Sequence, residues 1–324
     1  MLMSRRFIIA GLAALALSSV ASAQDVSDNA PVVITSPASW ATMRSDSIAL
    51  SIQADPVLLP TGSVDIKVNR RSGNRTTVLF TRNVKVEEGS AEVFLGRSRD
   101  VPLGGTDFLS IEWSVPQTDY KGTVEPVGIA KLSGKVVDNK WVPARPPLTA
   151  VRLEADLSDT AAAAALAGSQ NTFDAGGAKF AAGWNAEKFY ILFTPAQSVT
   201  AVEVALDLKC GKNAFLSRAD RFIRYSVTGD SVFARHYNRA VGTTGITYEE
   251  LVWGSARSLT ALRAEGTARL ITVQWSELGI QPFEERNIGI SVYVDTRGKR
   301  QPVTYPPAAV RNIPGTWGDI TLAK

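Results

Sequence analysis

One histidine and one cysteine, His236 and Cys210, are the residues of the 324-residue chain best suited to nucleophilic or general-base chemistry. A single cysteine cannot form an intramolecular disulfide, and zinc sites of the Cys/His kind need several such ligands. A Ser-His-Asp or Cys-His mechanism would have to use His236, and no Gly-x-Ser-x-Gly segment accompanies it. The scarcity of both residue types predicts a protein that binds rather than one that reacts.

Carboxylates offer a second route to catalysis. The adjacent pairs Glu249–Glu250 and Glu284–Glu285 would be the acid and base of a glycosidase. Such an enzyme holds two carboxylates about 5–10 Å apart in one cleft, whereas neighbours on a strand point to opposite faces. We therefore interpret both pairs as exposed charges and expect no enzyme. The sequence also lacks the P-loop, Gly-x-Gly-x-x-Gly and HExxH motifs.

Aromatic and polar residues near the C-terminus suit the recognition of a saccharide. The C–H face of a sugar ring stacks on a flat aromatic side chain, and planar polar groups bind its hydroxyls. Trp253, which we expect between clear strands and open to solvent, and Tyr305 are the aromatic candidates. Asp295 and Arg297 lie in a turn near Tyr305. These four residues are the predicted carbohydrate-binding set. Burial of the two rings and a solvated charged turn are the competing interpretations.

The chain begins with the three parts of a secretory signal peptide. Arg5 and Arg6 precede an apolar run of 11 residues, Phe7–Leu17, and a small-x-small site ends at Ala23. Eleven apolar residues are too few to cross a bilayer core of about 30 Å. We expect cleavage after Ala23, export to the periplasm or the extracellular space, and no membrane span.

The charge balance gives no indication of a nucleic-acid partner. The net charge of +4 falls to +2 when Arg5 and Arg6 leave with the signal peptide, and the remaining basic residues are dispersed. We expect no cofactor. A structural calcium ion stays open, because oxygen ligands in a β-sandwich do not require a compact acidic loop.

The elements that must position these residues are almost all strands. Over 31–130, apolar and polar residues alternate in about seven short runs separated by turn signals, as in Ile48, Leu50 and Ile52. This pattern is typical of an immunoglobulin-like β-sandwich. Over 131–324 further strands follow, with one short helix at Asp159–Gly168 that Ser158 or Asp159 caps. The sequence therefore predicts an all-β chain, with a jelly-roll-like β-sandwich as its second domain.

The second domain resembles the family 9 carbohydrate-binding modules and their DOMON-like relatives. Seven ordered segments carry the resemblance: Gly134–Trp141, Phe180–Tyr190, Val202–Leu208, Asp220–Tyr225, Ile271–Ile280, Asn287–Asp295 and Gly315–Leu322. The resemblance implies a non-catalytic module that binds a saccharide. Sugar binders of the family hold a terminal sugar ring between two tryptophans. In the stretch that carries one of them, this sequence has Tyr305 and no tryptophan before Trp317.

These observations predict an exported, non-catalytic carbohydrate-binding protein, with a signal peptide over 1–23 and two β domains over 31–130 and 131–324. Its expected partner is a saccharide or a cell-surface glycan. The alternative is a structural or protein-interaction component of the cell envelope that has the sandwich but no sugar site. A hydrolase of unrecognised type is the third interpretation.

Overall fold

The computed structural model describes residues 31–324, except 44–46, 98–99, 102, 104–106, 130–133, 138–139, 144–146, 156, 254–258 and 264–266. The predicted signal peptide and the predicted domain junction at 130–131 lie outside the described residues. None of the helices in the described part of the chain has the length and apolar character needed to span a membrane.

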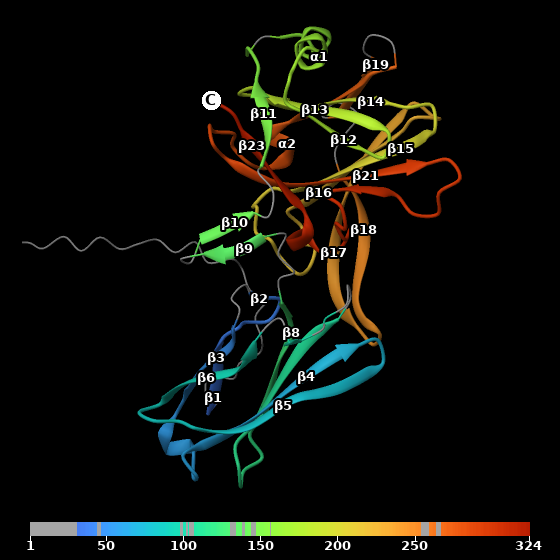
Figure 1. The fold of residues 1–324 in the computed structure, drawn as a ribbon. Helices are drawn as coiled ribbons and strands as arrows, with labels where there is room; N and C mark the ends of the chain where they lie inside the picture. The colour runs from blue at the N-terminus through green and yellow to red at the C-terminus, as the bar shows by residue number, and fades with distance from the viewer. Residues whose placement is uncertain are drawn as a thin grey trace, which may run out of the picture.

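The N-terminal part is a sandwich of two sheets (Figure 1). Its inner faces carry the alternating apolar residues of the sequence, among them Ile48, Leu50, Val64 and Val68, all buried in one cluster. One sheet has the order β1 (Val32–Ser36), β3 (Ser47–Ala54) and β6 (Ser90–Arg97); the other has β2 (Thr42–Met43), β8 (Lys121–Ile129), β7 (Phe108–Ser114), β4 (Ser63–Ser72) and β5 (Arg75–Lys85). A short 3-10 turn, η1 (Pro56–Leu58), follows β3.

The C-terminal part is built on one continuous sheet, which has 13 strands among the described residues. Its order is β18 (Gly245–Trp253), β17 (Ser231–Gly242), β16 (Asp220–Ser226), β15 (Val199–Asp207), β21 (Asn287–Thr296), β23 (Gly318–Leu322), β11 (Leu148–Arg152), β13 (Ala178–Trp184), β14 (Lys188–Pro195), β20 (Arg269–Gln274) and β19 (Leu259–Arg263), with β12 (Thr172–Ala175) beside β13 and β22 (Val303–Tyr305) beside β21. Most neighbours are antiparallel, while β11 runs parallel to both β13 and β23.

This sheet folds over itself into two layers with the main core between them. The core joins Phe180, Phe189 and Ile191 of one layer to Val202, Val204 and other residues of the opposite layer. Outside the first layer, helix α1 (Asp159–Ala167) covers β13, β14 and β20 with Ala162 and Leu166. Outside the second layer, loops carrying Leu216 and Trp317 cover β15, β16 and β17.

The all-β prediction is confirmed, with a sandwich before a second, larger layered β structure. Helix α1 is confirmed as well, since the Ser158 side chain caps its start and Gly168 follows its end. The continuity of the large sheet, and the length of the β17–β18 hairpin, were not predicted. The remaining elements are a two-stranded sheet of β9 (Gly134–Val137) and β10 (Lys140–Pro143), the short helix α2 (Trp275–Leu278) and the 3-10 turn η3 (Pro314–Thr316).

Candidate functional site

The outer face of the second layer carries a cluster of charged side chains from neighbouring strands. Strand register pairs Glu203 of β15 with Arg224 of β16, and Arg224 with Phe233 of β17. Cross-strand partners lie on the same face of a sheet, so these three side chains share one face. Val202 and Val204 face the core on the other side, which fixes Glu203 on the outside by alternation.

A buried carboxylate is the centre of this cluster. Glu203 is 2% exposed, and Arg311, from the segment between β22 and η3, donates to both its oxygens at 2.6 and 3.1 Å. Arg235 of β17 approaches the same carboxylate at 3.5 Å. Burial would lower the pKa of Arg311, but the hydrogen bonds and charge of Glu203 outweigh burial and raise it. Two guanidinium groups therefore compensate one charge that burial alone would destabilise.

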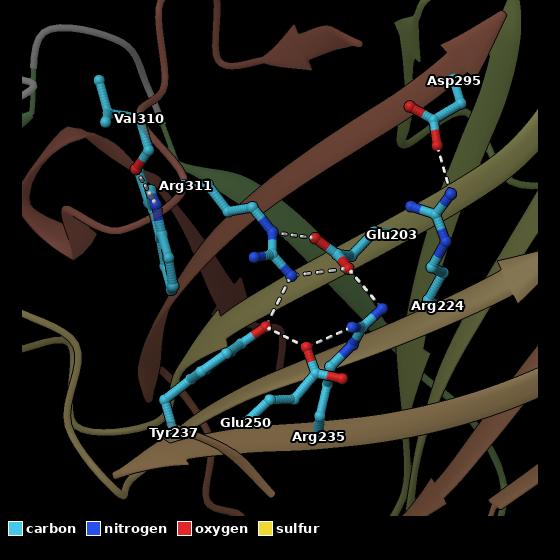
Figure 2. Close-up of polar contacts among 9 residues, drawn as sticks. Glu203, Arg224, Arg235, Tyr237, Glu250, Asp295, Val310 and Arg311 are labelled. Atoms are coloured by element: carbon cyan, nitrogen blue, oxygen red, sulfur yellow. Dashed lines mark hydrogen bonds and ion pairs between the residues drawn. The ribbon is translucent and has the colours of Figure 1, made fainter. Parts of the chain in front are cut away.

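Tyr237 and Glu250 extend the network across β17 and β18 (Figure 2). The Tyr237 hydroxyl accepts from Arg311 at 2.8 Å and donates to Glu250 at 3.2 Å. Arg235 donates to Glu250 at 2.5 Å. This hydrogen bond is the main cause that lowers the pKa of Glu250, so Glu250 is a carboxylate at neutral pH. Burial raises the pKa of Tyr237, so its hydroxyl keeps its proton.

The rim of the cluster is open to solvent. Arg224 binds Asp295 of β21, and both side chains are about one-third exposed. The Phe233 ring is 43% exposed, with the guanidinium of Arg235 5.2 Å from its centroid. We call the eight residues of this cluster the Glu203 face: Glu203, Arg224, Phe233, Arg235, Tyr237, Glu250, Asp295 and Arg311.

The Glu203 face combines an accessible ring with planar groups that are already fixed in position. Three guanidinium groups and three carboxylates balance in charge. The solvent-exposed members of these pairs can bind a neutral polar ligand, because carboxylates accept hydrogen bonds and guanidinium groups donate them. The single histidine lies outside this face, because His236 follows Arg235 on β17 and so points to the opposite side of the strand.

Of the four residues predicted from sequence, Asp295 lies on the Glu203 face. Trp253 was expected to lie between strands; instead it is the last residue of β18, half-buried against the core, and its indole donates to the Glu277 carbonyl at 3.2 Å. The Tyr305 ring packs against Phe173 at 4.6 Å. Arg297 is exposed in the turn after β21.

Trp253 and Tyr305 lie on strands that are not neighbours in the sheet. Strand β18 and strand β22 are five strand spacings apart, about 24 Å measured along the sheet. Both rings pack against the core, so neither is presented to solvent as one side of a two-ring clamp. The positions of the two rings agree with the competing interpretation, in which they pack against the sandwich.

Sequence reasoning missed most of the Glu203 face. Glu203 gave a signal, since it is a charged residue inside the apolar strand Val202–Leu208. Arg311 gave none, because it lies 108 residues further along the chain in a segment without regular structure. Phe233 lies in the run Ser231–Arg235, which is readable as a strand, but the sequence does not say which of its faces is open to solvent.

Two other buried carboxylates on the outer face, those of Asp319 and Asp220, are compensated within the protein. Among the described residues, no three or more His, Cys, Asp or Glu side chains are grouped to hold a metal ion. The Lys212 ammonium lies 2.5 Å from Asp319 and donates to the Trp317 carbonyl at 2.9 Å. Burial, followed by the charge of neighbouring Asp207, raises the pKa of Asp220 to about 8.

Comparisons with known proteins give structural likeness without a sequence relative. No family model matches the chain, and no curated protein matches its sequence. Two solved structures of a family 9 carbohydrate-binding module from Caldicellulosiruptor kristjanssonii, with glucose and with cellotriose, are 12% and 13% identical to it. Both have a TM-score of 0.35 and cover 55% of this chain, and 97% and 94% of their own chains.

Two further structures extend the comparison. A putative carbohydrate-binding protein from Bacteroides uniformis has a TM-score of 0.39 at 7% identity, over 54% of this chain and 98% of that one. The CBD12 structure from CALX1.2 has a TM-score of 0.20 at 8% identity, over 82% and 79%. The matches to the family 9 module span about half of this chain. These matches concern the fold and say nothing of the Glu203 face.

Proposed function

We propose that this chain binds a saccharide on the Glu203 face and does not transform it. The observation that carries the proposal is the exposed ring of Phe233 beside two charge pairs that are already ordered, Arg224–Asp295 and Arg235–Glu250. A pyranose presents an apolar C–H face to an aromatic ring and hydroxyl groups at its rim. The hydroxyls would donate to the carboxylates and accept from the guanidinium groups.

The buried part of the network supports this proposal through preorganisation. Arg235 is held by Glu203 and by Glu250, and Arg311 is held by Glu203 and Tyr237. Long side chains normally lose rotamer entropy when a ligand immobilises them, about 1 kcal/mol each. Here that cost falls on folding rather than on binding, so hydrogen bonds to a ligand contribute more of their energy to affinity.

The protonation states on this face favour binding over hydrolysis. A glycosidase needs one carboxylic acid whose pKa is raised, so that it can protonate the leaving oxygen. The hydrogen bond from Arg235 lowers the pKa of Glu250 instead. Glu203 is already occupied by a bidentate contact with Arg311. Neither Glu250 nor Glu203 is suited to the role of general acid.

Export belongs to the same proposal, because a cell-surface or extracellular glycan would be met outside the cytoplasm.

A protein-interaction role in the envelope is the second candidate. The observation that favours it is Val252, which is 86% exposed on β18 next to Arg235, so that Val252 and Phe233 together offer an apolar surface to a protein.

Calorimetric titration with a panel of neutral and acidic oligosaccharides, with and without calcium, tests the proposal. We expect binding by the chain, and a loss of about two- to tenfold in affinity for Phe233→Ala, from the ring contribution alone. Phe283→Ala is the matched control, since Phe283 is 58% exposed and has the Arg286 guanidinium 5.2 Å from its ring, outside the Glu203 face. Flat titrations over the whole panel, or equal losses in both variants, would contradict saccharide binding on this face.

A further inference from the structure

The β17–β18 hairpin extends beyond the sheet that carries it. Strand β17 pairs with β16 from Ser231 to Arg235, and beyond Arg235 its registered partner among the described residues is β18 alone. A two-stranded ribbon has little stability of its own in water. Tyr237 and Glu250 are in this extended half, which we define as residues 236–251. Two members of the Glu203 face therefore depend on whatever holds it in place.

The tip of the hairpin packs on the N-terminal sandwich (Figure 1). Ile246 of β18 is buried together with Phe108 of β7 and Phe215 of the loop after β15. The turn of the hairpin also reaches the β4–β5 turn, where a Cβ placed on Gly73 would lie 3.9 Å from the Thr244 carbonyl oxygen. We call the packing between the hairpin and the N-terminal sandwich the seam. It consists of Trp40, Phe108, Phe215, Arg239, Ile246 and Tyr248.

Trp40 is a second residue, besides Phe108, through which the N-terminal sandwich contacts the hairpin. The guanidinium of Arg239 on β17 lies 4.4 Å from the centroid of the Trp40 ring, and the ring meets Phe215 edge-on at 5.8 Å. Trp40 has a φ of +63°, a conformation that residues other than glycine seldom adopt. Its N–H donates to the Pro126 carbonyl at 2.6 Å, which holds the strained residue in position.

Packed side chains connect the seam to the binding face. Arg239 and Tyr248 are cross-strand partners, and Tyr248 meets the Tyr237 ring edge-on at 6.4 Å. The Tyr237 hydroxyl in turn bonds to both Arg311 and Glu250. A shift of the hairpin would therefore move Tyr237 and Glu250 away from the buried Glu203 and Arg311.

We infer that the N-terminal sandwich positions the binding face: Trp40, acting through Arg239 and Tyr248, orders the extended half of the hairpin. Trp40 and Arg239 are thus positioning residues that touch no ligand. The consequence for a saccharide rests on the proposed function. The ordering of the hairpin is a property of the free protein and is measured without any ligand.

Hydrogen exchange of the full chain, read by mass spectrometry, tests the inference. We expect amides of residues 236–251 to exchange about tenfold faster or more in Trp40→Ala and in Arg239→Gln. In both variants the hairpin can open without the free-energy cost of breaking the contact between Trp40 and Arg239. Strands β13 and β14 should exchange as in the unchanged protein. Arg82→Gln is the matched control for Arg239→Gln, since Arg239 donates to the Leu216 carbonyl and Arg82 donates to the Phe94 carbonyl on the N-terminal sandwich.

Folding of the variants is checked in the same data. Unchanged protection of β4 and β7 in Trp40→Ala shows that the N-terminal sandwich is intact. Arg239→Gln removes the contact between Arg239 and Trp40 by a change in the hairpin and leaves the sandwich sequence unchanged. Unchanged exchange at 236–251 in both variants overturns the inference and leaves saccharide binding untouched. Faster exchange together with flat titrations would refute saccharide binding and leave the inference standing.

Discussion

Removal of Arg311 is the change that most directly probes the buried charge of the Glu203 face. Arg311→Met keeps much of the aliphatic length and removes the guanidinium. Glu203, 2% exposed, would keep Arg235 at 3.5 Å as its remaining cation. The bidentate pair at 2.6 and 3.1 Å would be lost.

The expected loss follows from burial. Removing one partner of a fully buried ion pair costs about 3–5 kcal/mol. The Arg311 side chain is 37% exposed, and Arg235 still compensates part of the charge, so we expect about 2–3 kcal/mol less free energy of unfolding. The variant Arg224→Met is the control, because it breaks a pair in which both partners are about one-third exposed. There we expect less than about 1 kcal/mol.

Urea unfolding at pH 7, followed by tryptophan fluorescence, measures both losses. The second arm is the double variant Glu203→Leu/Arg311→Met, which removes both charges. We expect it to be more stable than Arg311→Met alone, because no buried carboxylate is left without its partner. Equal stability of Arg311→Met and the unchanged protein, or simple additivity in the double variant, would refute the assignment of Glu203 as a buried charge that Arg311 neutralises.

Two further predictions concern groups away from this face. The pKa of Asp220 is raised to about 8, so its contribution to stability is full below its unfolded pKa near 4 and is lost as the pH rises through 8; thermal melts from pH 5 to 9 should show this decline, and Asp220→Asn should flatten it. At Gly122 an added Cβ would lie 2.6 Å from the Trp113 ring, so Gly122→Ala should lower the free energy of unfolding by about 1–3 kcal/mol, and an unchanged urea midpoint would contradict this contact.

The strands that sequence analysis located are those with one apolar face. In β3 and β15 the period of two is visible because one side packs into a core. The extended half of the β17–β18 hairpin was not predicted as strand, because polar residues lie on both of its sides, Tyr237 and Arg239 on one and His236 and Asn238 on the other. Its stability comes from the seam, a contact between distant segments that local pattern cannot indicate.

The candidate site was predicted less well than the fold, for a related reason. Trp253 and Tyr305 were chosen as aromatic residues outside clear strands, and tertiary packing places both against the core. Phe233 is exposed because strand alternation places it on the outer face, opposite Val232 and Ala234, which pack with the core. A single residue step along a strand therefore decides whether a ring packs inside or faces a ligand.

Substitutions on the two faces of the large sheet should affect different properties of the protein. The inner faces are apolar and closely packed, so substitutions there alter stability. The Glu203 face draws Phe233, Arg235, Tyr237 and Glu250 from one hairpin, whose far end is held by the seam. Exchanging residues on that hairpin can alter the exposed groups while the seam and the core stay intact. Ligand specificity should therefore be easier to alter at Phe233 and Glu250 than at Glu203, because both oxygens of the Glu203 carboxylate are bound by Arg311.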